Sequence, residues 1–246
     1  MSSKHASHRR RLAFLPTIKV RSYLTLLAAL FILFIIAPWL SSITIFTIRV
    51  SDLLSLLVLV AGIYAVHRSR IAALAMCLLG AATVGCQLMY HFGMGESWAV
   101  VANFFAFSFL LGLFLIIEYD VFTAPRVTTE TLAGASCGYV LMAAIFASLY
   151  SILLQFDPDG LTLWPGAVIE PSQLTFQSAE YGVLGYFSIA TLTTLGYGDI
   201  VPNSTATRSA AAVEALIGQL YIAIVIARLI GMYISARNSD GVSQHA

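Results

Sequence analysis

Residues 179–203 read AEYGVLGYFSIATLTTLGYGDIVPN, and this stretch decides the fold. It lies between two long apolar runs, and its own apolar part extends only from Ala179 to Thr193. A helix needs about 20 apolar residues to cross about 30 Å of hydrocarbon, so the about 13 to 15 available here are too few. Irregular backbone at membrane depth persists only where it is buried in protein or lines a water-filled cavity. The stretch therefore predicts a re-entrant helix followed by an irregular segment that lines a pore.

The composition of the whole chain indicates a lipid environment. Of its 246 residues, 59% are apolar and 10% are charged, and the mean hydropathy is +0.87. A soluble domain is about 45 to 50% apolar and about 25% charged, so a soluble enzyme and a disordered chain are excluded. The net charge of +1 offers no electrostatic footprint for nucleic acid. The chain contains no nucleophile triad, phosphate-binding loop or Cys/His cluster with metal-ligand spacing, so we expect no enzyme and no cofactor.

Six apolar segments approach the length of a membrane-spanning helix. We therefore expect an all-α integral membrane protein with six transmembrane helices and the re-entrant segment between the fifth and the sixth. The expected helices cover residues 23–40, 50–66, 71–90, 98–117, 131–156 and 209–235. The corresponding division of the chain is a basic N-terminal tail (1–22), a four-helix membrane region (23–120), a pore domain (121–235) and a short tail (236–246).

Lys and Arg are distributed unevenly between the connections of these helices. The tail before the first helix carries six of them and no acidic residue. Arg68, Arg70, Arg126, Arg228 and Arg237 fall on the same side as this tail, whereas Arg49 and Arg208 fall on the other side. Because cytoplasmic connections are enriched in Lys and Arg, we expect a multi-pass protein of the plasma membrane with both termini in the cytoplasm. A cleaved secretory signal is less favoured, because the first apolar run exceeds about 15 residues; an organelle presequence stays open.

The end of the re-entrant segment, Thr191 to Asp199, reads TLTTLGYGD. It resembles the filter of the potassium channels, whose motif is Thr-Val-Gly-Tyr-Gly preceded by a Thr-rich pore helix and followed by Asp. The one departure is Leu195, which replaces the usual Val or Ile. The resemblance covers residues 131–235 and implies a channel subunit of the bacterial type, with six helices and a two-helix pore module.

The resemblance also assigns roles within the filter. It implies that the backbone carbonyls of Thr194, Leu195, Gly196 and Tyr197 bind K⁺, with the Thr194 hydroxyl adding the innermost ring. Successive carbonyls can face the same way only if the backbone visits positive φ, which Gly196 and Gly198 permit without steric cost. Since one chain supplies only one wall of such a pore, the resemblance implies a homotetramer around one axis.

Residues around the filter are expected to support it. Some members of the family carry a Glu on the pore helix that bonds to the Asp after the filter, but the matching residue here is Ala190. Asp199 therefore needs another partner, for which we expect the Tyr186 hydroxyl. Thr193 belongs to the same supporting set through the Thr-rich end of the pore helix. Five acidic residues around the outer mouth would concentrate cations there: Asp157, Asp159, Glu170, Glu180 and Asp199.

Two residues of the sixth helix lie at filter depth. Glu214 needs a partner because charge inside a membrane is costly. We expect it to brace the filter through a hydrogen bond behind the pore helix, to Thr191 or Thr193, or to stay protonated. Gly218 follows Tyr197 by 21 residues, the place of a gating hinge in the family. Close helix packing is an equally good interpretation of this glycine.

The fourth apolar run, 98–117, contains no Lys or Arg. A voltage sensor needs several charges there, because each contributes only about 2.3 kcal/mol per 100 mV. The sequence thus predicts a K⁺-selective channel that conducts passively, with little intrinsic voltage dependence and with the lipid bilayer, K⁺ and other copies of the chain as its partners. A weakly selective cation channel is one alternative. A non-conducting membrane subunit that associates with other channels is another.

Overall fold

The computed structural model describes residues 22–40, 44–45, 48–66, 70–95, 97–163 and 182–243. Within them it contains seven α-helices and four short strands. The helices are α1 (Ser22–Leu40), α2 (Val50–Val66), α3 (Arg70–His91), α4 (Ser97–Thr123), α5 (Thr129–Phe156), α7 (Leu184–Leu192) and α8 (Thr205–Ser243). The strands are β1 (Thr44–Ile45), β2 (Ile48–Arg49), β3 (Leu161–Leu163) and β4 (Ile200–Pro202). The N-terminal tail, Arg68, Glu170 and Glu180 lie outside the described residues.

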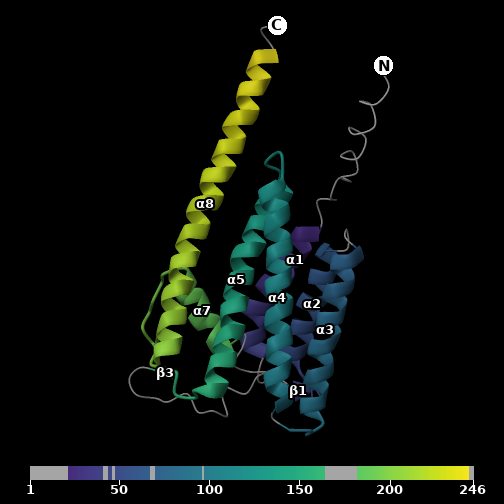
Figure 1. The fold of residues 1–246 in the computed structure, drawn as a ribbon, viewed down its shortest axis with the longest axis vertical. Helices are drawn as coiled ribbons and strands as arrows, with labels where there is room; N and C mark the ends of the chain where they lie inside the picture. The colour runs from purple at the N-terminus through teal and green to yellow at the C-terminus, as the bar shows by residue number, and fades with distance from the viewer. Residues whose placement is uncertain are drawn as a thin grey trace, which may run out of the picture.

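The helices form an elongated bundle in which α5 is central (Figure 1). Helix α4 packs on α3 and α5, α1 packs on α2 and α5, and the short helix α7 packs on both α5 and α8. In an 18-residue apolar window of α5, 78% of the residues are buried, against 11% in such a window within Thr205–Met232 of α8. A single chain therefore covers α5 with its own helices and leaves most of α8 open.

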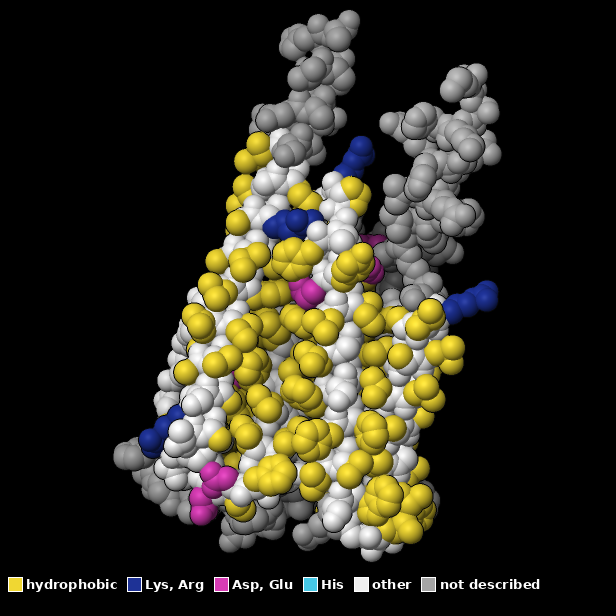
Figure 2. Space-filling view, in the orientation of Figure 1, with side chains coloured by type: hydrophobic (Ala, Val, Ile, Leu, Met, Phe, Trp, Pro, Cys, Tyr) yellow, Lys and Arg dark blue, Asp and Glu magenta, His cyan; other side chains and the backbone are white. Residues whose placement is uncertain are grey.

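Six of the helices match the six expected ones in number and order. Four are long and apolar enough to cross a membrane: Arg70–His91, Ser97–Thr123, Thr129–Phe156 and Thr205–Met232. The apolar parts described for α1 and α2 are shorter, Tyr23–Ile36 and Leu56–Val66, so their crossings stay predictions. Apolar side chains cover the middle of the visible face, and the Lys and Arg side chains seen on it lie toward the ends (Figure 2).

The structure corrects three details of the expected elements. The fold is helical but includes two small antiparallel sheets, β1–β2 and β3–β4, because backbone groups that leave the helices must still find partners. Helix α4 continues beyond residue 117 to Thr123. Helix α8 continues to Ser243, so most of the expected tail 236–246 is helical. The expected ends followed the apolar runs, whereas a helix continues into polar sequence where no proline or cap stops it.

The connection between α4 and α5 is short. Only residues 124–128 separate the two helices. Thr128 caps α5: its hydroxyl accepts from the Thr131 backbone N–H at 3.2 Å, and the Thr131 hydroxyl accepts from the Thr128 N–H at 3.3 Å. This reciprocal arrangement is a capping box. Because five residues span at most about 18 Å, α4 packs beside the α5 of its own chain.

The first residues of α1, the α4–α5 connection and the last turns of α8 lie at one end of the bundle (Figure 1). The α3–α4 connection and strand β3 lie at the opposite end. Two apolar clusters form the core of the bundle. One includes residues of α1, α2, α4 and α5, and the other includes residues of α5, α7, β3 and β4. The second cluster positions the segment after α7, which contains the filter motif.

Candidate functional site: the filter segment

Helix α7 contains the first two residues of the filter segment, which we define as Thr191 to Asp199. It has nine residues, and its apolar side chains Leu184 and Phe187 are buried in the cluster with Tyr150 of α5. The Phe187 and Tyr150 rings meet edge to face with centroids 5.0 Å apart, a favourable geometry for aromatic pairs. Nine residues cannot cross a membrane, so α7 is re-entrant in length, as expected. It ends at Leu192, where its C-terminal partial negative charge lies beside the first filter residues.

The backbone dihedral φ alternates in sign along the filter segment. Thr194, Gly196 and Gly198 have φ of 57°, 55° and 76°, whereas Leu195 and Tyr197 do not have positive φ. Residues of opposite hand in alternation turn successive peptide planes so that their carbonyls can face one side. The positive φ expected at the two glycines is confirmed. The positive φ of Thr194 was not expected, because a β-branched residue pays about 1–2 kcal/mol for this conformation.

Hydrogen bonds from α7 hold Thr194 in this conformation. Its N–H donates to the Thr191 carbonyl at 3.0 Å, and its hydroxyl donates to the Thr193 carbonyl at 2.7 Å. The Gly196 N–H donates to the Ala190 carbonyl at 3.2 Å. The helix end and the filter are therefore one hydrogen-bonded unit. The sequence carries no signal for the Thr194 conformation apart from the motif itself.

Asp199 has the partner that the sequence suggested. The Tyr186 hydroxyl donates to Asp199 Oδ2 at 2.8 Å, and the Ile200 N–H donates to Oδ1 at 3.1 Å. The Tyr186 ring also stacks on the Tyr197 ring, with centroids 6.5 Å apart and planes 6° from parallel. The hydrogen bond to Asp199 raises the pKa of Tyr186 to about 12, so the phenol remains a donor at ordinary pH. One aromatic side chain thus contacts both the filter and the residue after it.

The outer end of the filter is tied to the end of α5. Strand β4, directly after Asp199, pairs with β3 so that Ile200 faces Leu163 and Pro202 faces Leu161. The Gly160 carbonyl accepts from the Asn203 N–H at 2.8 Å and from the Thr207 hydroxyl at 2.6 Å. Both ends of the filter are therefore anchored within the chain.

Glu214 lies behind α7, as expected, but its partners differ from the expected ones. It is fully buried, accepts from the Tyr150 hydroxyl at 2.7 Å and forms a short hydrogen bond with the Ser188 hydroxyl. Neither Thr191 nor Thr193 bonds to it. Thr193 donates to its own helix at the Ile189 carbonyl, the usual choice of a helical Thr. The sequence did not lead us to expect Tyr150 and Ser188 as partners of Glu214. The signal that could have identified them is a polar side chain in an apolar helix at the same depth as Glu214.

Gly218 lies against the end of α7. A Cβ at this position would be 2.5 Å from the Leu192 carbonyl oxygen and 2.8 Å from Leu192 Cδ1. The Tyr139 hydroxyl of α5 donates to the same carbonyl at 3.2 Å. Of the two interpretations left open by the sequence, this contact supports close packing. It joins α5, α7 and α8 one residue before Thr193.

Most residues of the filter segment are exposed in a single chain. Leu195 is 53% exposed and Tyr197 is 68% exposed. Thr193, Thr194 and Gly196 are also exposed. In a single chain these residues therefore form an open surface and not an enclosed site.

Comparison with known proteins places residues 138–235 in a family whose description is ion channel. This part of the chain, from α5 through the filter segment into α8, is therefore an ion-channel pore module. The chain as a whole is a multi-pass membrane protein and not an enzyme. No curated protein and no solved structure matches the chain.

Proposed function

We propose that the chain is the subunit of a K⁺-selective channel, in which the carbonyls of residues 194–197 and the Thr194 hydroxyl replace the hydration shell of the ion. The observation that carries this proposal is the alternation of positive φ at Thr194, Gly196 and Gly198. Carbonyl rings in a filter substitute for the water around K⁺. Two supports hold the geometry of this segment: the buried Glu214 and the exposed Tyr186–Asp199 pair.

The proposed assembly is a homotetramer. Ion channels of the matched kind typically assemble as oligomers. Exposed apolar residues occur around much of α8, among them Leu216, Leu220, Ile224 and Ile230. Lipid covers some of this surface, and neighbouring copies cover the part next to the filter, because one wall cannot enclose an ion. Six crossings with both termini in the cytoplasm complete the proposal, in agreement with the distribution of Lys and Arg.

A flux assay on the purified full-length chain tests the proposal. The chain is reconstituted alone in liposomes, and K⁺ and Na⁺ fluxes are compared under matched gradients. Selective K⁺ flux is the expected result, together with a complex mass of four chains in detergent. Equal K⁺ and Na⁺ fluxes would instead support a weakly selective cation channel, which the replacement of Val or Ile by Leu195 in the motif favours. Absence of both fluxes, with intact protein in the liposomes, would support a non-conducting subunit.

A further inference from the structure

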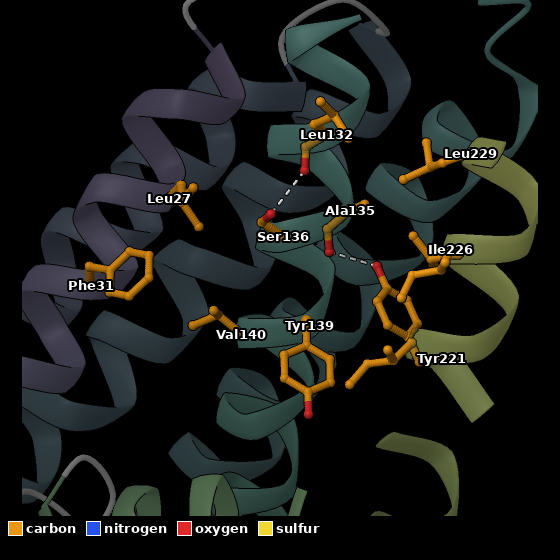
Figure 3. A pocket seen from close by; sticks show the side chains of 12 residues that line it. Leu27, Phe31, Leu132, Ala135, Ser136, Tyr139, Val140, Tyr221, Ile226 and Leu229 are labelled. Carbon is orange, nitrogen blue, oxygen red and sulfur yellow. Dashed lines mark hydrogen bonds between the residues drawn. The ribbon is translucent and has the colours of Figure 1, made fainter. Parts of the chain in front are cut away.

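A second buried carboxyl, outside the filter, joins the four-helix region to α8. Glu118 of α4 is 8% exposed, and its Oε1 lies 2.7 Å from the Tyr221 hydroxyl of α8. The same hydroxyl lies 2.7 Å from the Ala135 carbonyl oxygen of α5, a contact drawn in Figure 3. Glu118 Oε2 has no hydrogen-bond partner among the described residues. Three helices therefore meet at one hydroxyl group.

Counting protons at this contact indicates the state of the carboxyl. The Tyr221 hydroxyl has one proton, and a backbone carbonyl can only accept. If Tyr221 donates to Ala135, the hydrogen bond to Glu118 requires a proton from the carboxyl. The chain of donors then runs from Glu118 to Tyr221 and on to the Ala135 carbonyl, and no charge is placed in the span.

Gly138 of α5 makes room for this contact. A Cβ at Gly138 would overlap Glu118 Oε1 and would lie 2.6 Å from the Tyr221 hydroxyl. Gly134, one turn earlier, packs in the same way against Val121 of α4 and Tyr23 of α1. The two glycines lie four residues apart on α5 and form a face for close helix packing, and Gly138 additionally makes room for the carboxyl.

The contact lies beside the part of α8 that packs on the main apolar cluster through Val225. Tyr221 follows the packed Gly218 by three residues, and beyond it α8 borders an apolar groove of about 430 Å³ between α1, α5 and α8 (Figure 3). Farther along α8, Arg228 donates to the Phe122 carbonyl and covers the Phe122 ring at 5.4 Å. The polar contacts of this half of α8 thus go to the last turns of α4 and, through Tyr221, to the Ala135 carbonyl of α5.

We propose that Glu118 is a positioning residue for α8. In its protonated form Glu118 fastens Tyr221 to α4 and α5, and α8 is released when the proton is lost to water on the cytoplasmic side. The inference rests on the proposed channel function. On release, the carboxyl O–H bond breaks and hydroxide takes the proton to form water. The fastened arrangement holds one proton more than the released one, so alkaline pH favours release.

The ionisable groups near this contact are few. Tyr221 touches Glu118, and Arg228 lies about two turns farther along α8. On α4, Asp120 accepts from Tyr23 of α1 at 2.8 Å. Helix α5 contributes Glu130, Cys137 and Tyr139. The Cys137 thiol donates to the Tyr23 carbonyl, and the Tyr139 ring lies 5.9 Å from the Tyr221 ring. Glu214 forms a similar contact through Ser188 and the Ala143 carbonyl, but both of its oxygens are bonded and it is fully buried. Glu118 differs from Glu214 in being 8% exposed and in having one carboxyl oxygen without a partner among the described residues.

Flux measurements on the full-length protein in liposomes test the release step. In the wild type, K⁺ flux is expected to rise with the pH on the cytoplasmic side. The equilibrium constant for release of α8 rises by up to about tenfold per pH unit in each subunit. Glu118→Gln keeps a donor for Tyr221 but cannot ionise, so low flux without pH dependence is expected. Tyr221→Phe removes the contact, so high flux without pH dependence is expected. Glu130→Gln, at a buried acid of α5 that is not bonded to Glu118 or Tyr221, serves as control and keeps the wild-type profile.

Infrared spectroscopy tests the proton independently of conduction. A protonated-carboxyl band that disappears in Glu118→Gln and shifts in Tyr221→Phe is the expected result. Absence of this band in the wild type, or a pH profile that Glu118→Gln leaves unchanged, overturns the proposal. If the band behaves as expected but no variant conducts K⁺, the proposed function fails and the proton assignment stands.

Discussion

At the scale of single residues, the filter segment combines two kinds of backbone requirement. Gly196 and Gly198 take positive φ at no steric cost. Thr194 takes it at a cost and is held by hydrogen bonds from the end of α7. The residue that supplies a side-chain oxygen to the proposed ion path is thus also the one whose conformation depends on its neighbours.

Gly196→Ala is expected to abolish K⁺-selective flux. An alanine at φ 55° pays about 1–2 kcal/mol, and relaxing it would turn a carbonyl away from its neighbours. Open space surrounds Gly196 in a single chain, so the fold of the subunit should survive. The measurement is K⁺ and Na⁺ flux in liposomes together with the melting temperature of the protein. Gly231→Ala, in an open position of α8, is the control and should conduct normally.

At the scale of elements, α7 is held from behind by α5 and α8. Glu214 bonds to Tyr150 of α5 and to Ser188 of α7, and Gly218 of α8 meets the Leu192 carbonyl. These contacts fix the distance between the two long helices and the short one. A change at either position is therefore expected to affect the filter without touching it.

Gly218→Ala separates packing from hinge motion. The added Cβ would be 2.5 Å from the Leu192 carbonyl, and backbone cannot move away as a side chain can. Overpacking of this kind costs about 1–3 kcal/mol, so a lower melting temperature and altered selectivity are expected. Unchanged stability with a change confined to opening and closing would support the hinge instead.

Glu214→Leu is expected to destabilise the filter more than Glu214→Gln. Leucine leaves the buried Tyr150 and Ser188 hydroxyls without this partner, at about 1–3 kcal/mol for each unsatisfied group. Glutamine can donate to Ser188 and accept from Tyr150. Melting temperature and the ratio of K⁺ to Na⁺ flux provide the comparison. Equal values for the wild type and Glu214→Leu would show that Glu214 does not brace the filter.

The helices were largely predictable from the sequence, but most of the side-chain contacts between them were not. Apolar runs located six helices because lipid imposes a length on each span, and the short run before the filter predicted the re-entrant α7. The hydrogen bond between Tyr186 and Asp199 is an exception among the contacts: the family resemblance led us to expect it, because Ala190 stands where some members carry the Glu that bonds to this Asp. The partners of Glu214 depend on the rotation of α5 and α7 about their axes, which hydrophobicity does not determine for helices that are apolar on most sides.

At the scale of the whole molecule, the four-helix region is joined to the pore module by packing and by polar contacts at α4. The acidic residues Glu118 and Asp120 lie in the last turns of α4, and no Lys or Arg occurs between Ser97 and Thr123. Helix α4 therefore lacks the basic residues that a voltage sensor requires.

Conductance is accordingly expected to change little with voltage. A steep response requires several charges that move through the field, at about 2.3 kcal/mol per charge per 100 mV, and α4 offers no basic residue. Planar-bilayer recordings in symmetrical K⁺, without blocking ions, supply the measurement. A steep conductance–voltage curve under these conditions would contradict the expectation.

The five-residue connection between α4 and α5 also has a consequence for biosynthesis. Because α4 reaches the α5 of its own chain and no farther, the contact between the two regions closes within one polypeptide as soon as α5 has entered the membrane. Its formation is a first-order step that does not depend on subunit concentration. In the proposed tetramer, newly made chains would therefore associate with this interface already complete. Only the surfaces of α8 and the filter segment would form contacts in the association step.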